Sequence, residues 1–150
     1  PSGSSTAVGT DADLLEKTLA TFTIPANTML ADFSQGFSLW ANHSVVAVGA
    51  TCRVKVDGVT VSTGAFGSIP VTGALILRME GMRTSAGFIA GNVTMLNGAA
   101  VGSAVIVSGG YTAVLVPNTA MVITITGQND AVAAADRLRF TSGHLTYQGV

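Results

Sequence analysis

The segment from Cys52 to Val61 alternates apolar and polar residues on both sides of an Asp57-Gly58 pair. A period of two sends successive side chains to opposite faces of a strand, so one face is buried and the other is wet. Asp-Gly between two such runs is the strongest short-range signal for a hairpin, because both central residues of a type I′ turn need positive φ. The segment therefore predicts two antiparallel strands joined by a two-residue turn.

A second constraint is the segment from Thr18 to Met29, which reads as a strand, a corner and a new strand. Proline fixes its own φ and pushes the preceding residue toward extended geometry, so Ile24 is expected to end the first strand. Asn27 has a short side chain that can bond its own backbone and hold a tight bend. The second strand is expected near Thr28–Asp32. The predicted structural corner consists of Ile24, Pro25, Ala26 and Asn27.

The rest of the chain repeats this combination of short alternating runs and turn signals. A loop is predicted at Thr63–Gly73, a loop or one helical turn at Gln128–Ala135, and turns at Asn97-Gly98 and Gly109-Gly110. An isolated glycine in a strand, here Gly81, often marks a bulge or a close backbone approach. The remaining strand candidates are Phe37–Ala41, Val45–Val48, Ala74–Arg83, Phe88–Leu96, Ala104–Val107, Tyr111–Val116, Met121–Thr126, Arg137–Phe140 and Leu145–Tyr147.

Roughly nine to eleven short strands with frequent turn signals predict an all-β fold, an antiparallel sandwich or barrel. At 150 residues the chain is expected to form one domain. Residues 1–13 are small and polar and are predicted to be an N-terminal arm, although Thr10–Leu15 permits a short helical turn or, equally, the start of a strand. Residues 14–150 are predicted to form the β-sandwich.

Charge is unusually scarce: 10% of the residues are Asp, Glu, Lys or Arg, against about 25% in an ordinary soluble domain. The mean hydropathy is +0.53. Extended apolar surface usually marks an interaction site. We therefore expect much of the surface to be covered in an assembly. A monomer with a polar but uncharged Ser, Thr and Asn surface remains the alternative.

The net charge is −1, and the basic residues are scattered along the sequence. This pattern does not indicate a basic surface for binding nucleic acid or an anionic membrane. No apolar run approaches the roughly 18 residues of a membrane helix. The absence of a basic-then-apolar leader leads us to expect a protein made and used without Sec export. The single cysteine, Cys52, rules out an internal disulfide framework and lies in an alternating apolar row, which favours a small core residue.

No motif for catalysis, cofactor binding or metal binding is found, so no catalytic, cofactor or metal residue is predicted. His43 and His144 lack an obvious third ligand and make a poor metal site. Glu80, near Arg78 on the longest strand candidate, is more simply explained by an ion pair on one face or by an interface contact than by acid catalysis. An enzyme acting on polysaccharide is the least favoured function, because the few acids do not cluster.

Four residues are candidates for a protein interface: Trp40, Arg78, Glu80 and Arg83. Trp40 lies opposite Phe37 and Leu39 in the alternation, so it is expected to face outward, and Trp and Arg are favoured in interfaces. The alternative is that Trp40 caps one end of the core. Arg78, Glu80 and Arg83 fit a contact with a neighbouring subunit as well as they fit a solvated face.

Six short segments, taken in order, form a recognisable series: Ile24-Pro25-Ala26-Asn27-Thr28-Met29, Leu39-Trp40-Ala41-Asn42, Arg53–Val61, Arg78 to Thr84, Ile123–Gln128 and the alanine-rich Ala131–Asp136. In this order they resemble a family of tailed-bacteriophage virion structural proteins with a jelly-roll domain, of the capsid decoration or head-fibre type. The resemblance covers roughly Thr18 to the C-terminus. The chain departs from the family at Ala50-Thr51-Cys52 and in the Phe33–Gly36 loop.

The resemblance implies a jelly-roll-like β-sandwich that assembles as a homotrimer on the capsid surface of a virion built in the host cytoplasm. The implied function is that of a capsid decoration (cement) protein, which contacts the major capsid protein or another virion component. Nucleic acid, membrane and cofactors are not expected partners. The alternative is a tail-fibre or tail-tip module that binds a host surface receptor.

Overall fold

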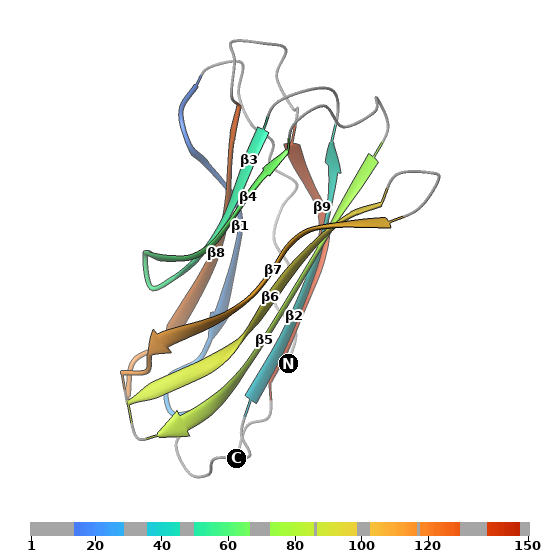
Figure 1. Cartoon of the computed structure of the whole chain (residues 1–150). Coiled ribbons are helices and arrows are strands. Elements are labelled where there is room, and N and C mark those ends of the chain that lie inside the picture. The colour runs from blue at the N-terminus through green and yellow to red at the C-terminus, as the bar shows by residue number, and fades with distance from the viewer. Residues whose placement is uncertain are drawn as a thin grey trace.

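The computed structural model is an antiparallel β-sandwich of two packed sheets (Figure 1). The structure describes residues 14–28, 36–45, 50–66, 73–85, 87–98, 103–116, 118–129 and 138–147. Within these ranges the strands are β1 (Lys17–Ile24), β2 (Gly36–Val45), β3 (Ala50–Val56), β4 (Val59–Phe66), β5 (Gly73–Ser85), β6 (Phe88–Gly98), β7 (Ser103–Val114), β8 (Met121–Asn129) and β9 (Leu138–Tyr147). The predicted all-β sandwich is confirmed. The described part of the chain contains no helix long and apolar enough to span a bilayer.

One sheet has four strands in the order β1-β8-β3-β4, and the other has five in the order β7-β6-β5-β2-β9. Only the β3–β4 hairpin and the β5-β6-β7 meander connect neighbours within a sheet. The other connections cross from one sheet to the other, as in jelly-roll-like sandwiches. The five-stranded sheet is strongly twisted, and the last part of β7 curves toward the start of β8 (Figure 1). Each sheet therefore has one face in the core and one face outside.

The two turns predicted from local sequence are present. β1 ends at Ile24, Pro25 follows, and Asn27 takes a φ of 64° in the turn. In the β3–β4 hairpin, Asp57 and Gly58 have φ of 48° and 82°, as a type I′ turn requires. The Asp57 carboxylate accepts the Val122 N–H at 2.8 Å, and the Asp57 N–H donates to the Val122 carbonyl at 2.8 Å. The hairpin tip is thereby held against β8.

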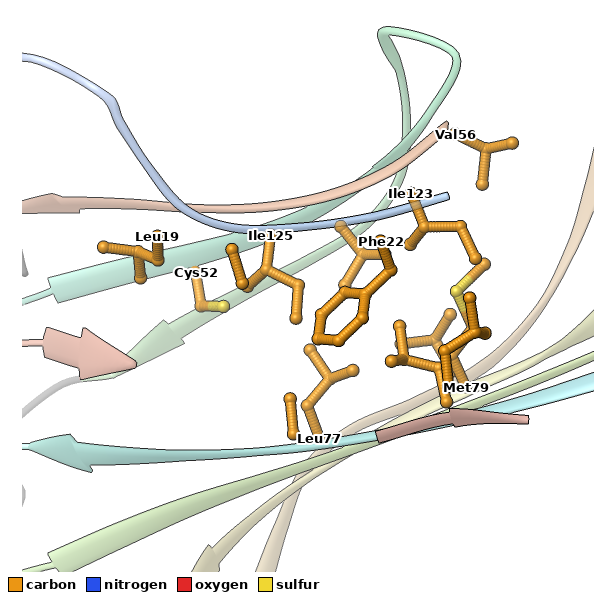
Figure 2. Packing of buried hydrophobic residues seen from close by; sticks show 14 of the residues in the cluster. Leu19, Phe22, Cys52, Val56, Leu77, Met79, Ile123 and Ile125 are labelled. Atoms are coloured by element: carbon orange, nitrogen blue, oxygen red, sulfur yellow. The ribbon is translucent and has the colours of Figure 1, made fainter. Parts of the chain in front are cut away.

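The core lies between the sheets and is built from alternate residues of each strand. β3 shows this clearly, because Cys52, Val54 and Val56 are buried while the residues between them are half-buried. Phe22 of β1 points toward the opposite sheet, where Leu77 and Met79 lie (Figure 2). The Phe22 ring meets the Phe140 ring of β9 edge to face, with centroids 6.2 Å apart. Edge-to-face contact is a favourable geometry for aromatic pairs, so these rings help to hold the sheets together.

Several predicted loops and turns are wrong because the strands are longer than expected. β4 continues to Phe66, into the predicted Thr63–Gly73 loop, and Gly64 pairs with Cys52. β7 runs without interruption through Gly109-Gly110, where two separate strands were expected. In each case hydrogen bonds from a neighbouring strand hold glycine in extended geometry, which local propensity did not anticipate.

The same correction applies to three other segments. β6 includes the Asn97-Gly98 pair that was expected to end it, and β8 extends to Asn129. The predicted strands Arg137–Phe140 and Leu145–Tyr147 are one strand, β9, with an irregularity where it pairs with Asn42 and His43 of β2. The Thr141 hydroxyl donates to the Asn42 carbonyl at 2.9 Å there, which satisfies an acceptor beside the irregularity.

Some predictions fall on other parts of the chain. The arm at residues 1–13 lies outside the described residues, as does most of the second strand predicted at Thr28–Asp32, whose Thr28 belongs to the turn. Val45 ends β2, and the rest of the predicted Val45–Val48 run is also outside the described ranges.

Candidate functional site

The outer face of the five-stranded sheet brings three of the four predicted interface residues together. Trp40 of β2 pairs with Arg78 of β5. Two residues along each strand, at the next position that faces outward, Ser38 pairs with Glu80. The residues between them, such as Leu39 and Met79, are fully buried in the core. Trp40 is 44% exposed, so its predicted outward orientation is confirmed and the alternative of a core cap is wrong.

Arg83 does not belong to this surface. The alternation along β5 sends Arg78 and Glu80 outward and Arg83 to the opposite side, where it pairs with the buried Ile89. The four predicted interface residues therefore cannot meet one partner on a single face. Arg78 and Glu80 share the outer face as predicted, but the described residues contain no ion pair between them.

An open groove of about 590 Å³ lies in the same outer face. It crosses β9, β2, β5 and β6, which contribute the polar side chains of Thr146, Ser38, Glu80 and Asn92. These four residues form one cross-strand row, because each pairs with the next in register. Hydroxyl, amide and carboxylate groups thus line the groove beside exposed Met82.

Two of the residues that line the groove are glycines at a crowded point of the sheet. Gly81 of β5 and Gly91 of β6 pair with each other and line the groove. A Cβ at Gly91 would overlap the Glu80 carbonyl oxygen, and a Cβ at Gly81 would lie 2.5 Å from both the Phe37 ring and the Tyr111 hydroxyl. The backbones of β5 and β6 can therefore approach closely here because Gly91 carries no side chain, whereas the space at Gly81 is filled by the Phe37 ring and the Tyr111 hydroxyl. The predicted close approach at Gly81 is confirmed, whereas the register shift of β5 lies at Arg83/Ser85.

Exposed apolar side chains also gather on this sheet. Phe88 and Val114 pair across β6 and β7, and Met82 faces outward on β5. Of the eight large apolar residues that are exposed in the described ranges, five belong to this sheet or lie just beyond it: Trp40, Met82, Phe88, Val114 and Val116. The other three are Leu14, Leu15 and Val59. The outer face of the five-stranded sheet is therefore the most apolar outer surface that the structure describes.

The outer face of the four-stranded sheet is different, because its charges are paired within the chain. The Glu16 carboxylate lies 2.6 Å from the Lys55 amine and 3.6 Å from the Arg53 guanidinium, and it accepts the Thr126 hydroxyl at 2.5 Å. The hydrogen bonds from Lys55 and Thr126 hold the pKa of Glu16 below its usual range. Gln128 accepts from Arg53 at 2.9 Å and donates to the Leu14 carbonyl at 2.8 Å. This cluster binds the start of the described chain to β3 and β8.

The residues considered for chemistry occupy separate places. Cys52 is fully buried, and burial raises the pKa of its thiol to about 12, so it is a core residue as predicted and a poor nucleophile. His144 is exposed on β9 opposite Trp40, and the side chain of His43 lies outside the described residues. Burial also raises the pKa of Tyr111. Among the described residues no three His, Cys, Asp or Glu side chains gather closely enough to hold a metal ion.

Sequence reasoning identified Trp40, Arg78 and Glu80 but missed Ser38, Asn92 and Thr146 as partners in the groove. Isolated serine, asparagine and threonine residues carry no signal of their own in a β-rich chain. A signal was present in Gly81 and Gly91, two glycines inside alternating strands, but only the register shows that they lie side by side.

Comparisons with protein-family models, with curated proteins and with solved structures found no match to this chain.

Proposed function

We propose that this protein is a virion structural protein, a homotrimeric decoration protein that stabilises a phage capsid from its surface. The observation that carries the proposal is the exposed apolar surface of the five-stranded sheet on a chain with few charged residues. Surfaces of this kind are usually covered by a partner. The resemblance of the Ile24–Met29 corner and the later motifs to phage virion proteins supplies the virion context.

The architecture suits such a role physically. The nine strands form a sandwich whose core is shared by both sheets, so it offers firmly supported outer faces for contact. Three copies held on one axis would attach at three points, and multivalent attachment raises the effective concentration of each contact. Moderate contacts of each chain with the major capsid protein or another virion component would then add up to stable binding.

The test is to remove the protein from particles and to add it back. Particles without it should lose infectivity or release DNA at a lower temperature or a smaller osmotic shock, and added protein should restore resistance. Unchanged resistance would remove the proposed stabilising role. Native mass spectrometry of the purified protein measures the number of copies, and a mass other than three chains or a multiple of three would contradict the trimer.

One observation favours a second candidate, a tail-fibre or tail-tip module that binds a host surface receptor. The groove is lined by hydroxyl, amide and carboxylate groups from Ser38, Asn92, Thr146 and Glu80, with Tyr147 beside them. A few convergent polar groups in a concave site suit a small polar ligand such as a sugar. Binding to host cells or to a glycan array, lost in Glu80→Ala and retained in Thr23→Ala on the other outer face, would favour this candidate over decoration.

A further inference from the structure

The groove and Trp40 lie next to each other on the outer face of the five-stranded sheet, and their chemistry is complementary. We propose that this face binds the same face of a second copy of the chain, related by a two-fold axis that runs across the strands between the Trp40–Arg78 pair and the Ser38–Glu80 pair. This contact is additional to the three-fold association proposed above and does not depend on it.

The register determines what such an axis would bring together. Outward residues two positions apart on a strand are separated by about 7 Å along it. A two-fold axis lying in the interface midway between the two pairs places β2 on β2 and β5 on β5 of the second copy. Trp40 of each copy then lies over Ser38 of the other, at the groove, and Arg78 of each lies over Glu80 of the other.

Charge complementarity is the first argument for this arrangement. Arg78 and Glu80 are both exposed, and neither forms an ion pair among the described residues. A contact between identical faces must be self-complementary, because when one residue of the first copy meets a second residue of the other copy, the reverse contact forms as well. In each copy Arg78 lies on one side of the axis and Glu80 on the other. Arg78 of each copy therefore meets Glu80 of the other, which gives two ion pairs and brings no like charges together.

The next positions outward provide the second argument. The axis places the pair Ile76–Leu96 of one copy over the pair Met82–Ala90 of the other. Ile76 and Leu96 are half-buried and Met82 is 56% exposed, so apolar groups meet apolar groups. Large side chains also meet small ones, since Trp40 lies over Ser38 and Leu96 over Ala90. Alternation of large and small residues lets two sheet faces pack closely at the usual spacing of about 10 Å.

A reciprocal charge exchange tests the contact. R78E and E80R each place like charges together twice, so each variant alone should weaken self-association by at least about tenfold. In an equimolar mixture of R78E and E80R, every carboxylate of one chain meets a guanidinium of the other, so mixed pairs of chains should form. Native mass spectrometry distinguishes the mixed pair from either variant alone.

Trp40 gives an independent measurement, because it is the only tryptophan in the chain. Its fluorescence should shift to shorter wavelength as wild-type protein is concentrated, and R78E should move this shift to a protein concentration at least about tenfold higher. T23E, which adds a charge to the other outer face, is the matched control and should behave like wild type. Circular dichroism and thermal unfolding show whether each variant is folded.

Wild-type protein with no even-numbered oligomer and no concentration-dependent fluorescence would overturn the inference. So would folded R78E and E80R that fail to pair when mixed. A three-chain mass that R78E leaves unchanged would overturn this contact while leaving the decoration role in place. Conversely, a mixed pair of R78E and E80R on a protein that does not stabilise particles would support the contact and contradict the decoration role.

Discussion

The two outer faces of the sandwich differ in whether their charged side chains form ion pairs within the chain. On the four-stranded sheet, Glu16 is within ion-pair distance of both Arg53 and Lys55, and threonines cover the rest of β1 and β8. On the five-stranded sheet, Arg78 and Glu80 have no ion-pair partner among the described residues and stand beside exposed apolar side chains. The charged groups of the four-stranded face thus have partners within the chain. On the five-stranded face, both charged groups and apolar side chains remain exposed for contact with a partner.

If one shared core supports both faces, a large cavity in that core should destabilise the whole sandwich. Phe22→Ala makes such a cavity, and we expect it to have the largest effect on the free energy of unfolding. Phe22 is 1% exposed and contacts Phe140 of the other sheet. Its removal should lower the free energy of unfolding by about 3–5 kcal/mol, measured by chemical denaturation. Thr23→Ala, at the neighbouring exposed position, should change it by less than about 0.5 kcal/mol. Two separate unfolding transitions in the wild type would show that the sheets do not share a core.

The close approach of β5 and β6 beside the groove should depend on the absence of a side chain at Gly91. Gly91→Ala would overlap the Glu80 carbonyl oxygen, and we expect a loss of about 3 kcal/mol. The matched control is Gly109→Ala in β7, where a Cβ meets nothing within 4 Å. That variant should be neutral or stabilised by about 0.4–1 kcal/mol, because alanine restricts the unfolded chain. Equal stability of the two variants would contradict the close backbone approach.

The paired charges of the four-stranded face should make a pH-dependent contribution. The folded pKa of Glu16 is lowered from 4.5, so its contribution is present above about pH 4.5 and is lost as pH falls through the folded value. Glu16→Gln should cost about 1 kcal/mol or less at pH 7, since the group is partly exposed. The difference from wild type should shrink in acid. Thr23→Ser changes no titratable group, so its difference in free energy of unfolding from wild type should not depend on pH. If the difference for Glu16→Gln grew in acid, the pKa of Glu16 would not be lowered by folding.

The smallest expected effect on stability concerns the exposed apolar residues. Val114→Thr and Val59→Thr, at 60% and 67% exposure, should each change the free energy of unfolding by less than about 0.5 kcal/mol. They should differ in dye binding, because Val114 adjoins Phe88 on the apolar face while Val59 lies beside the hairpin of the other sheet. We expect a hydrophobic fluorescent dye to bind less to Val114→Thr only. If Val114→Thr and Val59→Thr bound the dye equally well, the two outer faces would not differ in exposed apolar surface.

Sequence reasoning identified much of the fold and part of the site. The strand ends at Ile24 and the Asp57-Gly58 turn are local properties, set by proline, asparagine and glycine geometry, and both are confirmed. The outward orientation of Trp40 follows from alternation alone. The Gly109-Gly110 prediction was wrong because hydrogen bonds from β6 outweigh the turn preference of two glycines. Arg83 was named with Arg78 and Glu80 as an interface candidate, but it lies an odd number of positions from both along β5 and is therefore on the other face.

By itself, therefore, the sequence determined the central part of most strands, which side of those strands is apolar, and the turns at Pro25–Asn27 and Asp57-Gly58, because these depend on neighbours along the chain. Only the tertiary structure decided which strands are adjacent, since backbone hydrogen bonds join residues far apart in sequence. That pairing set Trp40 beside Arg78, aligned Gly81 with Gly91, and gathered Ser38, Asn92 and Thr146 around Glu80. The candidate site exists as a surface only because β9, β2, β5 and β6 lie side by side in that register.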